Sequence, residues 1–410
     1  MKDFIENQDF LKILAQAEAL KKSGKRFSDI EDGQGNQYVD LVQEGGGVLG
    51  IALVGYTYVL EAAGIRFFSL AGTSAGAINT MMIAGLGPMQ EAKSEKILDI
   101  LSRKSLFDLV DGDKAVRSII QKAVRGEKGI GLRVLFNART LYKTIMDKFG
   151  LNPGSNFETW ITEELAKAGV KTMADIKKLM GKLPAKMKNV RDGNIDKLVP
   201  KLAIIAADVT THSKIEFPEM TELFFKDPEK VSPAKMVRTS MSIPLFFEPV
   251  TFDSIPNSGT KNDANWMTHC RYAGEVPSKV TFVDGGMLSN FPINVFHRSD
   301  GGVPRWPTFG AKLSTYRESY SKLNSLTNFF GSMISSMRQI HDYDFLKRNP
   351  DYNKLICHID ADKEFNWLDF EISRSEQVRM FLHGAKEGLE FLDCFDWEGY
   401  REVRAKLSRI

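Results

Sequence analysis

One short segment combines a serine with the glycines that a catalytic turn needs. Residues 72–76 read Gly-Thr-Ser-Ala-Gly, the pattern Gly-x-Ser-x-Gly with Ser74 at its centre. Gly72 and Gly76 allow a tight turn without Cβ clashes, and such a turn between a strand and a helix holds the serine hydroxyl exposed. The start of a helix behind Ser74 also favours negative charge on a reacting carbonyl. The segment predicts a nucleophile for acyl transfer; the alternative is a glycine-rich turn with an incidental serine.

A run of glycines precedes the serine motif and offers backbone N–H donors. Gly45, Gly46 and Gly47 are adjacent, and Gly50 follows three residues later. This spacing also fits the Gly-x-Gly-x-x-Gly pattern of dinucleotide sites, but that pattern needs an acid at the end of the next strand. The strand expected there ends Ser-Leu-Ala-Gly at residues 69–72, without an acid. We therefore interpret the three adjacent glycines as an oxyanion hole, whose N–H groups hold the oxygen of a tetrahedral intermediate.

A carboxylate is expected at the end of another strand. Asp284 follows the apolar run at residues 280–283 and precedes Gly285 and Gly286, which would let it approach another backbone closely. Asp-Gly is also a common turn former. A hydrolase with a Ser-His-Asp triad needs a histidine after the acid, and His297 is the best-placed candidate. The sequence has no His-Glu-x-x-His pattern, no His/Cys cluster with zinc spacing and no P-loop.

Length and composition indicate a globular chain. It has 410 residues, of which 43% are hydrophobic and 26% charged, ordinary values that exclude disorder along the whole chain. The formal net charge of +3 does not suggest a nucleic-acid partner. Cys270, Cys357 and Cys394 are far apart, which fits a reducing compartment rather than a disulfide framework. Without a signal-peptide pattern or a long apolar run, we expect a cytoplasmic protein or a secreted effector without a cleavable signal.

The elements that would carry these motifs alternate between strands and helices. Apolar runs predict strands near residues 38–42, 67–70, 201–208, 279–283, 308–314 and 354–359, with 212–217 as a hairpin partner. Helical spacing predicts helices near 1–23, 48–63, from 77 onward, 323–345 and 374–395. The β-α-β-α order predicts an α/β fold with a parallel sheet covered by helices. We expect an N-terminal helical extension (1–37), a catalytic domain (38–315) and a C-terminal helical region (316–410) packed on that domain.

Two segments have a basic character that bears on membrane contact. Residues 171–201 carry nine basic and three acidic residues, a net charge of +6. We interpret this stretch as a mobile basic insertion in the catalytic domain; it is either a solvated surface or a contact for anionic lipid headgroups. Residues 397–410 alternate basic and apolar residues, which indicates either a basic amphipathic membrane-surface helix or an ordinary helix packed on the domain.

Taken together, the three motifs are more specific than any one of them. In this order they resemble the patatin-like phospholipase family, lipid acyl hydrolases that use a Ser-Asp dyad. The segments Val-Arg-Thr-Ser-Met-Ser-Ile-Pro at 237–244 and Asp-Gly-Gly-Met-Leu-Ser-Asn-Phe-Pro at 284–292 also look like family segments. The likeness covers roughly residues 38–294. It implies a three-layer α/β/α fold of the patatin (FabD/lysophospholipase-like) type with a mainly parallel central sheet.

The resemblance also implies a mechanism. Asp284 takes the proton of Ser74, Ser74 attacks the ester carbonyl of a phospholipid or lysophospholipid, and Gly45–Gly47 hold the oxyanion. An acyl-enzyme forms, and water activated by Asp284 releases the fatty acid. No metal or organic cofactor is needed, and the enzyme visits the membrane surface transiently. The family also includes members switched on by an activating partner or second messenger.

Two other functions remain open from the residues. One is an α/β-hydrolase esterase with a Ser-His-Asp triad, in which a histidine such as His297 would be essential. The other is a catalytically silent lipid-binding or signalling protein on the same fold. The presence of all the expected catalytic residues argues against this second function. Fatty-acid release by the wild-type protein and by Ser74→Ala distinguishes a binder from an enzyme.

Overall fold

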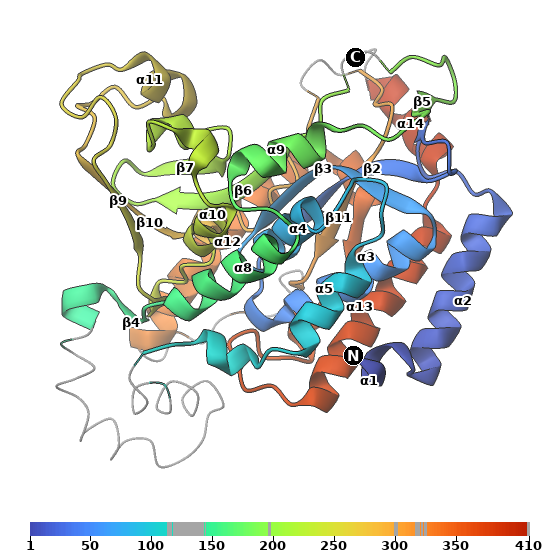
Figure 1. Ribbon diagram of the computed structural model, residues 1–410, viewed down its shortest axis with the longest axis horizontal. Helices are drawn as coiled ribbons and strands as arrows, with labels where there is room; N and C mark the ends of the chain where they lie inside the picture. Colours follow the sequence, from blue (N-terminus) through green and yellow to red (C-terminus); the bar gives the residue numbers. More distant parts are fainter. Residues whose placement is uncertain are drawn as a thin grey trace.

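A central sheet with helices on both sides organises the molecule (Figure 1). The computed structural model describes residues 1–112, 117, 143, 145–195, 198–298, 302–315, 320, 323 and 326–407. Within them, ten strands form one sheet with the order β12-β11-β2-β3-β6-β10-β9; β1 is paired with β2 and β5, and β7 with β6. The strands from β12 to β6 run parallel, whereas β7, β9 and β10 pair antiparallel. The expected α/β fold with a mainly parallel sheet is confirmed.

The strands and helices have the following bounds. The strands are β1 (Ile30–Glu31), β2 (Gln37–Gln43), β3 (Ile65–Thr73), β4 (Gly150–Asn152), β5 (Lys188–Asn189), β6 (Leu202–Asp208), β7 (Ser213–Phe217), β8 (Leu245–Phe247), β9 (Val250–Asp253), β10 (Lys279–Asp284), β11 (Thr308–Lys312) and β12 (Ile356–His358). The helices are α1 (Lys2–Ile5), α2 (Gln8–Ser23), α3 (Gly50–Ala62), α4 (Ala75–Gly85), α5 (Ser94–Ser102), α8 (Ser155–Lys167), α9 (Met173–Gly181), α10 (Pro233–Ser240), α11 (Ala264–Cys270), α12 (Leu326–Arg348), α13 (Arg374–Cys394) and α14 (Trp397–Leu407). β4 and β8 form a separate two-stranded sheet.

The strands at the centre of the sheet are buried along their whole length. All nine residues of β3 are buried, as are six of the seven in β2 and in β6. Continuous apolar runs of this kind are typical of parallel strands that helices cover on both faces. Each of β2 and β3 leads directly into a glycine motif and then into a helix, α3 or α4. The sheet therefore presents both motifs at the carboxyl ends of neighbouring strands.

Two expected helices differ from the structure near their starts. The helix predicted over residues 1–23 is divided into α1 and α2, because Asn7 caps α2: its Oδ1 accepts hydrogen bonds from Asp9 N at 2.9 Å and Phe10 N at 3.4 Å. The helix predicted over 48–63 begins with one turn of 3-10 helix at Gly47–Leu49 before α3. The glycines at this join explain the irregular start.

The basic stretch at 171–201 is built into the fold over its described residues. Met173, Ile176 and Met180 of α9 are buried, and β5 pairs antiparallel with β1. Arg191 Nε lies 2.7 Å from a carboxylate oxygen of Asp29, a buried residue. Residues 196 and 197 of the stretch lie outside the described residues. β5 and Arg191 therefore hold the middle of the stretch against β1 and the residue just before it.

The described part of the C-terminal basic segment, up to residue 407, packs partly on the domain. Trp397 and Tyr400 of α14 are buried, and the indole N–H of Trp397 donates to Asp29 Oδ1 at 2.9 Å. Arg404, also buried, lies 3.2 Å from Asp351. Membrane contact by this segment stays a prediction, since Trp397 and Tyr400 pack on the domain whereas Leu407 is exposed.

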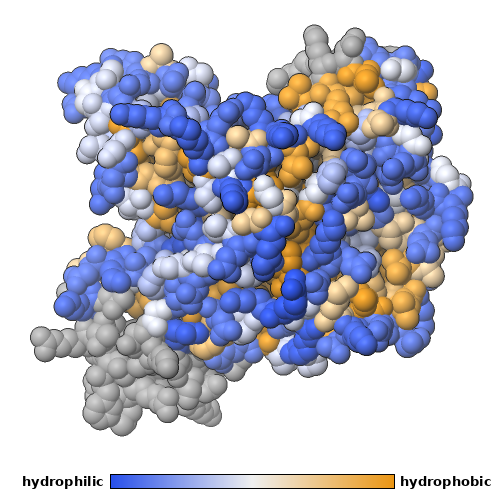
Figure 2. Space-filling view, viewed as in Figure 1, coloured by the Kyte–Doolittle hydropathy of each residue, from blue (hydrophilic) through white to orange (hydrophobic). Residues whose placement is uncertain are grey.

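One face of the molecule carries mostly polar side chains. Figure 2 shows hydrophilic side chains over most of one face, with smaller apolar areas between them. Among the described helices, none combines the length and the apolar composition that crossing a membrane requires.

Candidate active site

Ser74 occupies a sharp turn between β3 and α4. Its backbone has φ 51° and ψ −117°, a left-handed conformation that is costly for a residue with a side chain, and its N–H donates to Ser240 Oγ at 2.9 Å. The flanking glycines make the turn sterically feasible. A Cβ at Gly72 would lie 2.5 Å from the Gly76 carbonyl, and one at Gly76 would lie 2.3 Å from the Gln43 oxygen. The local geometry is that of a nucleophile elbow.

Asp284 lies at the carboxyl end of β10 and is buried, with 5% of its surface exposed. Its Oδ1 accepts a hydrogen bond from the Gly286 N–H at 2.7 Å, while Gly285 and Gly286 form the start of a 3-10 helix. Its Oδ2 is buried and accepts no hydrogen bond from the described residues. One carboxylate oxygen is therefore held in place, and the other is available to take a proton.

The register of the sheet brings the two residues together. β7 pairs along one edge of β6, so β3 and β10 share the opposite edge. β3 runs parallel to β6 and ends with Thr73 opposite Ile205. β10 runs antiparallel and ends with Asp284 opposite Ala206. The two strands thus meet end to end at adjacent positions of β6, and Ser74 follows directly at the junction.

The surroundings of Asp284 set its pKa in opposing directions. Burial raises the pKa above its ordinary value, while the positive charge of Arg338, the nearby Ser74 hydroxyl and the Gly286 N–H act to lower it. Burial outweighs the other three, so the net pKa is raised. A raised pKa makes the carboxylate a stronger base towards a serine hydroxyl than an exposed aspartate would be.

The glycine loop after β2 lies against Ser74 but does not offer all three of its N–H groups. A Cβ at Gly45 would come within 3.1 Å of Ser74 Cβ. The Gly45 N–H, however, donates to the Asn290 carbonyl at 3.0 Å. The backbone N–H groups of Gly46 and Gly47 donate no hydrogen bond to a described residue, and Gly47 has φ 55°, which favours glycine. Of the three predicted oxyanion donors, the structure therefore leaves Gly46 and Gly47 available. Gly50 begins α3 behind them.

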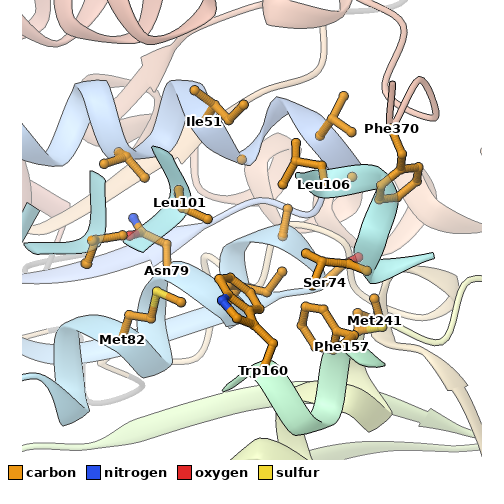
Figure 3. A pocket seen from close by; sticks show the side chains of 18 of the residues that line it. Ile51, Ser74, Asn79, Met82, Leu101, Leu106, Phe157, Trp160, Met241 and Phe370 are labelled. Atoms are coloured by element: carbon orange, nitrogen blue, oxygen red, sulfur yellow. The ribbon is translucent and has the colours of Figure 1, made fainter. Parts of the chain in front are cut away.

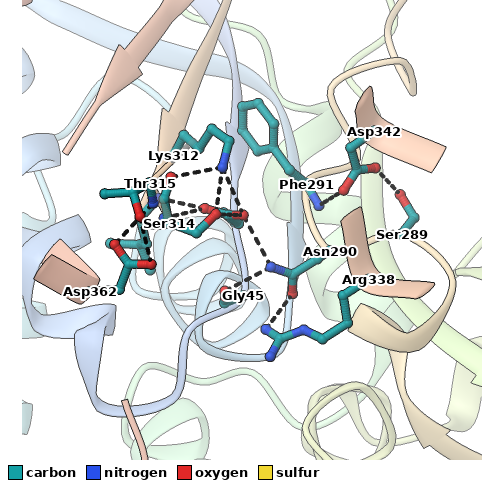
Figure 4. A network of polar contacts seen from close by, with 12 residues as sticks. Gly45, Ser289, Asn290, Phe291, Lys312, Ser314, Thr315, Arg338, Asp342 and Asp362 are labelled. Carbon is teal, nitrogen blue, oxygen red and sulfur yellow. Dashed lines mark hydrogen bonds and ion pairs between the residues drawn. The ribbon is translucent and has the colours of Figure 1, made fainter. Parts of the chain in front are cut away.

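Asn290 joins the glycine loop to the segment that follows Asp284 (Figure 4). Its Nδ2 donates to the Gly45 carbonyl and to Glu44 Oε1, at 3.1 Å each. Its Oδ1 accepts a hydrogen bond from Arg338 Nη2 at 3.0 Å. Sequence reasoning missed both Asn290 and Arg338 as individual site residues. Asn290 lies in the segment noted after Asp284, but Arg338 comes from α12 and had no sequence signal.

Glu44 anchors the start of the glycine loop. Its side chain is buried, and its two oxygens accept from the N–H groups of Leu313 at 2.6 Å and Ser314 at 2.8 Å, and from Ser314 Oγ at 2.6 Å. The Lys312 ammonium lies 3.4 Å from Glu44 Oε1 and neutralises it (Figure 4). Together these contacts fix the end of β2 against β11 and hold the following glycines in place.

A largely apolar cleft opens beside Ser74. Figure 3 shows Ser74, Met241 and Phe370 towards one end and Asn79, Met82 and Leu101 towards the other. The lining residues come from α3, α4, α5, α8 and the segments around 106–109, 241–247 and 370; apart from Ser74 and Asn79 they are apolar side chains or glycines. A cleft of this composition is suited to a hydrocarbon chain.

The histidine proposed for a triad lies elsewhere. His297 Nδ1 is 2.8 Å from the Tyr352 hydroxyl, and its ring packs edge-on against Phe345. Of the histidine side chains that the structure describes, none lines the cleft with Ser74; these are His212, His269, His297, His358 and His383. The side chain of His341 lies outside the described residues. Among the described side chains, no imidazole therefore lines the cleft with Ser74.

The family model of the patatin-like phospholipases matches residues 41–297, more than half of the chain. The chain belongs to the patatin-like phospholipase family. The predicted family is confirmed, and membership places the chain among lipid acyl hydrolases. All three glycine-containing motifs of this patatin-like chain lie within the matched residues.

Two curated proteins are similar to this patatin-like chain. The uncharacterized protein YqhO of Bacillus subtilis (strain 168) is 28% identical over 357 residues, which cover 87% of this chain and 98% of that protein. The RpoH suppressor of Rhizobium meliloti (strain 1021) is 23% identical over 230 residues, which cover 42% of this chain and 36% of that protein.

Two solved structures show a weaker likeness. VipD from Legionella pneumophila gives a TM-score of 0.37 at 16% identity, covering 90% of this chain and 70% of that one. ExoU of Pseudomonas aeruginosa, in its heterodimeric complex with SpcU from the type III secretion system, gives a TM-score of 0.35 at 14% identity, covering 87% and 52%. The family assignment rests on the family model.

No metal centre is formed by the described residues of this patatin-like chain. Within them, no three or more side chains of His, Cys, Asp or Glu gather in a way that could hold an ion. The described groups that could take part in acyl transfer are thus Ser74, Asp284 and the backbone N–H groups of Gly46 and Gly47.

Proposed function

We propose that this protein hydrolyses fatty-acyl esters of phospholipids or lysophospholipids through a Ser74–Asp284 dyad. The observation that carries the proposal is the end-to-end meeting of β3 and β10 on β6, with Thr73 opposite Ile205 and Asp284 opposite Ala206. The proposal is supported by the sharp turn at Ser74 and by the buried Asp284 carboxylate, of which one oxygen accepts no hydrogen bond from the described residues. The apolar cleft beside Ser74 supports a lipid as the substrate.

The first half of the reaction forms an acyl-enzyme. Asp284 Oδ2 takes the proton of the Ser74 hydroxyl as Oγ attacks the ester carbonyl. The carbonyl oxygen becomes an oxyanion, and the N–H groups of Gly46 and Gly47, with the N-terminus of α4, stabilise its charge. The tetrahedral intermediate then expels the alkoxide of the lipid, which takes the proton from Asp284. The acyl group remains on Ser74 as an ester.

The second half returns the enzyme to its starting state. A water molecule loses a proton to Asp284 Oδ2 and attacks the acyl-enzyme carbonyl, and the same N–H groups hold the second oxyanion. When this intermediate collapses, the Ser74 oxygen leaves and recovers the proton from Asp284. The fatty acid departs with the oxygen of water. Every proton in this cycle is held by Ser74, Asp284, the substrate or water, so neither half needs an imidazole.

The proposed substrate places the enzyme at a membrane surface. Phospholipids are presented in a bilayer, so a protein that hydrolyses them must contact that surface at least transiently. We propose peripheral, reversible association of a cytoplasmic or secreted protein, with the basic stretch 171–201 as the candidate contact.

The test is fatty-acid release from mixed micelles of phosphatidylcholine or lysophosphatidylcholine by the full chain. We expect Ser74→Ala and Asp284→Asn each to lower kcat at least a thousandfold, and the double variant to lose little more, because the two residues act as one unit. Ser155→Ala and Asp253→Asn, which change an exposed serine and an exposed aspartate, are matched controls and should keep wild-type turnover. Turnover in either dyad variant comparable to the controls would refute the dyad. Lipid binding without turnover by the wild type would favour the silent lipid-binding alternative.

A further inference from the structure

Asn79 is the polar exception deep in the apolar cleft. It lies in the second turn of α4, only 3% of its surface is exposed, and it lines the same cleft as Ser74. Figure 3 shows it between Met82 and Leu101, at the end of the cleft away from Phe370. Its Oδ1 is buried and accepts no hydrogen bond from any described residue. Buried polar atoms almost always have a partner, so an acceptor without one in a ligand cleft calls for an explanation.

A chain of hydrogen bonds determines which end of the Asn79 amide is left unpaired. Thr80 Oγ1 lies 3.1 Å from the Ala71 carbonyl, so its hydroxyl must donate there. Thr80 Oγ1 can then only accept from its other neighbour, Gln43 Nε2, at 2.9 Å. The side-chain oxygen of Gln43, Oε1, is left to accept a hydrogen bond from Asn79 Nδ2 at 2.6 Å. Rotating the Asn79 amide would set two carbonyl oxygens against each other, so the oxygen of Asn79 is the unpaired atom.

The position of Asn79 corresponds to the middle of an acyl chain. Ser74 caps α4 and Asn79 follows five residues later, which at 1.5 Å per residue is roughly 7 Å along the helix. An acyl chain whose carbonyl lies at Ser74 and whose tail follows the cleft towards Met82 passes Asn79 several carbons from the ester. A plain alkyl chain leaves the buried Oδ1 unpaired, as it is among the described residues, whereas a hydroxyl at this level donates to Oδ1 and removes the cost of the missing hydrogen bond.

We propose that Asn79 is a specificity-determining residue that selects acyl chains with a hydroxyl group in mid-chain. This inference rests on the proposed function, since it takes the cleft beside Ser74 as the acyl site. The ligand group must be a donor, because Oδ1 only accepts. It must also be neutral, because the cleft wall offers no acidic side chain to pair with a cation.

The experiment compares esters that differ only in one hydroxyl. Lysophosphatidylcholine with an octadecanoyl chain is hydrolysed in parallel with isomers that carry a single hydroxyl at successive chain positions. We expect kcat/KM to rise about tenfold or more for a narrow window of mid-chain positions and to stay flat for hydroxyls near the ester or the tail. In Asn79→Leu this preference should disappear or reverse. Met82→Leu, a change of similar volume in the same wall, should keep the wild-type preference.

A second variant separates recognition from damage to the fold. Asn79→Leu alone leaves Gln43 Oε1 without its donor, which destabilises the fold. The double variant Gln43→Met/Asn79→Leu removes both partners of this hydrogen bond. It should lose the substrate preference to the same extent, and its melting temperature should be closer to that of the wild type. The ratio of kcat/KM for the hydroxylated substrate to kcat/KM for the plain substrate is compared among the three proteins. If this ratio is the same in the wild type and both variants at every hydroxyl position, the proposal is overturned, and water satisfies Oδ1.

Binding to an inactive enzyme distinguishes this proposal from the proposed function. Ser74→Ala is titrated with the plain and the hydroxylated lysophosphatidylcholines, with and without Asn79→Leu. Tighter binding of the hydroxylated lipid that depends on Asn79, together with no hydrolysis by the wild type, would support the subsite while refuting the hydrolase. Hydrolysis of every isomer at one rate, with no difference in binding, would support the hydrolase and refute the subsite.

Discussion

Arg338 Nη2 donates a hydrogen bond to Asn290 Oδ1 at 3.0 Å, which ties α12 to the centre of the active site. Arg338 lies outside the residues matched by the family model. Its guanidinium also lies over the Trp367 ring, 5.0 Å from the centroid, and the Trp367 carbonyl accepts from the N–H of Val48 at 3.0 Å. Segments far apart in the sequence therefore position both the acid and the glycine loop.

The charge of Arg338 predicts a shift in the pH dependence of turnover. Asp284 must be deprotonated to act as a base, and the positive charge of Arg338 lowers its pKa against the effect of burial. Replacing Arg338 with Met removes this charge, so the pKa rises and activity on the acid side is lost at a higher pH. The pH profile of kcat/KM for a soluble ester measures the shift. Arg338→Lys should move the acid limb less, and superimposable profiles for all three proteins would contradict the electrostatic role.

Burial of the Asp284 charge predicts that its removal stabilises the fold. The folded-state pKa is raised above the ordinary value, so the folded protein binds a proton more readily than the unfolded chain does. The ionised carboxylate therefore costs stability above the folded-state pKa, and this cost fades as the pH falls towards the ordinary value of 3.8.

Asp284→Asn should accordingly melt at a higher temperature than the wild type near pH 7, by a few degrees, with the gap narrowing towards about pH 4. Its amide oxygen can still accept the hydrogen bond from the Gly286 N–H. Differential scanning calorimetry across this pH range measures the gap, with Asp253→Asn as the exposed control. A lower melting temperature for Asp284→Asn at neutral pH would mean that the carboxylate is a net stabilising charge.

The position of His297 predicts that no histidine acts as the base. His297 contacts the Tyr352 hydroxyl and the Phe345 ring rather than Ser74. His297→Ala should therefore lower kcat/KM by less than about tenfold, through lost packing rather than lost proton transfer. The same assay on His341→Ala covers the histidine whose side chain the structure does not describe. A loss as large as that of Ser74→Ala in either variant would establish a triad.

The basic stretch predicts a salt-sensitive contact with anionic membranes. Lys182, Lys186 and Lys188 are all exposed, but Lys188 lies 3.2 Å from Glu31, so reversing its charge would also break an ion pair. Lys182→Glu/Lys186→Glu should weaken co-sedimentation with phosphatidylserine vesicles, and wild-type binding should fall as salt rises towards about 0.5 M. Hydrolysis of a small soluble ester should not change. If the double variant binds vesicles as well as the wild type does, the stretch is a solvated surface and does not contact the membrane.

Local sequence was sufficient to predict that the three glycine-containing segments follow the ends of strands. The turn at Gly72–Gly76, the glycine run at Gly45–Gly47 and the carboxylate at Asp284 each depend on a few adjacent residues and on the strand before them. Backbone sterics act over that same short range, so glycine spacing and apolar runs carry the information. The same reasoning was less reliable at element starts, where the Asn7 cap divides the first helix.

Only the tertiary structure decided how these parts combine. That β3 and β10 end at neighbouring positions of β6 depends on strand order and register, which are set by packing over the whole sheet. The commitment of the Gly45 N–H to Asn290, the approach of Arg338 and the unpaired oxygen of Asn79 are likewise contacts between residues remote in sequence. A hydrogen bond depends on the positions of both partners in space. The amino-acid sequence gives the donors and acceptors that are present but not which of them come within reach of one another.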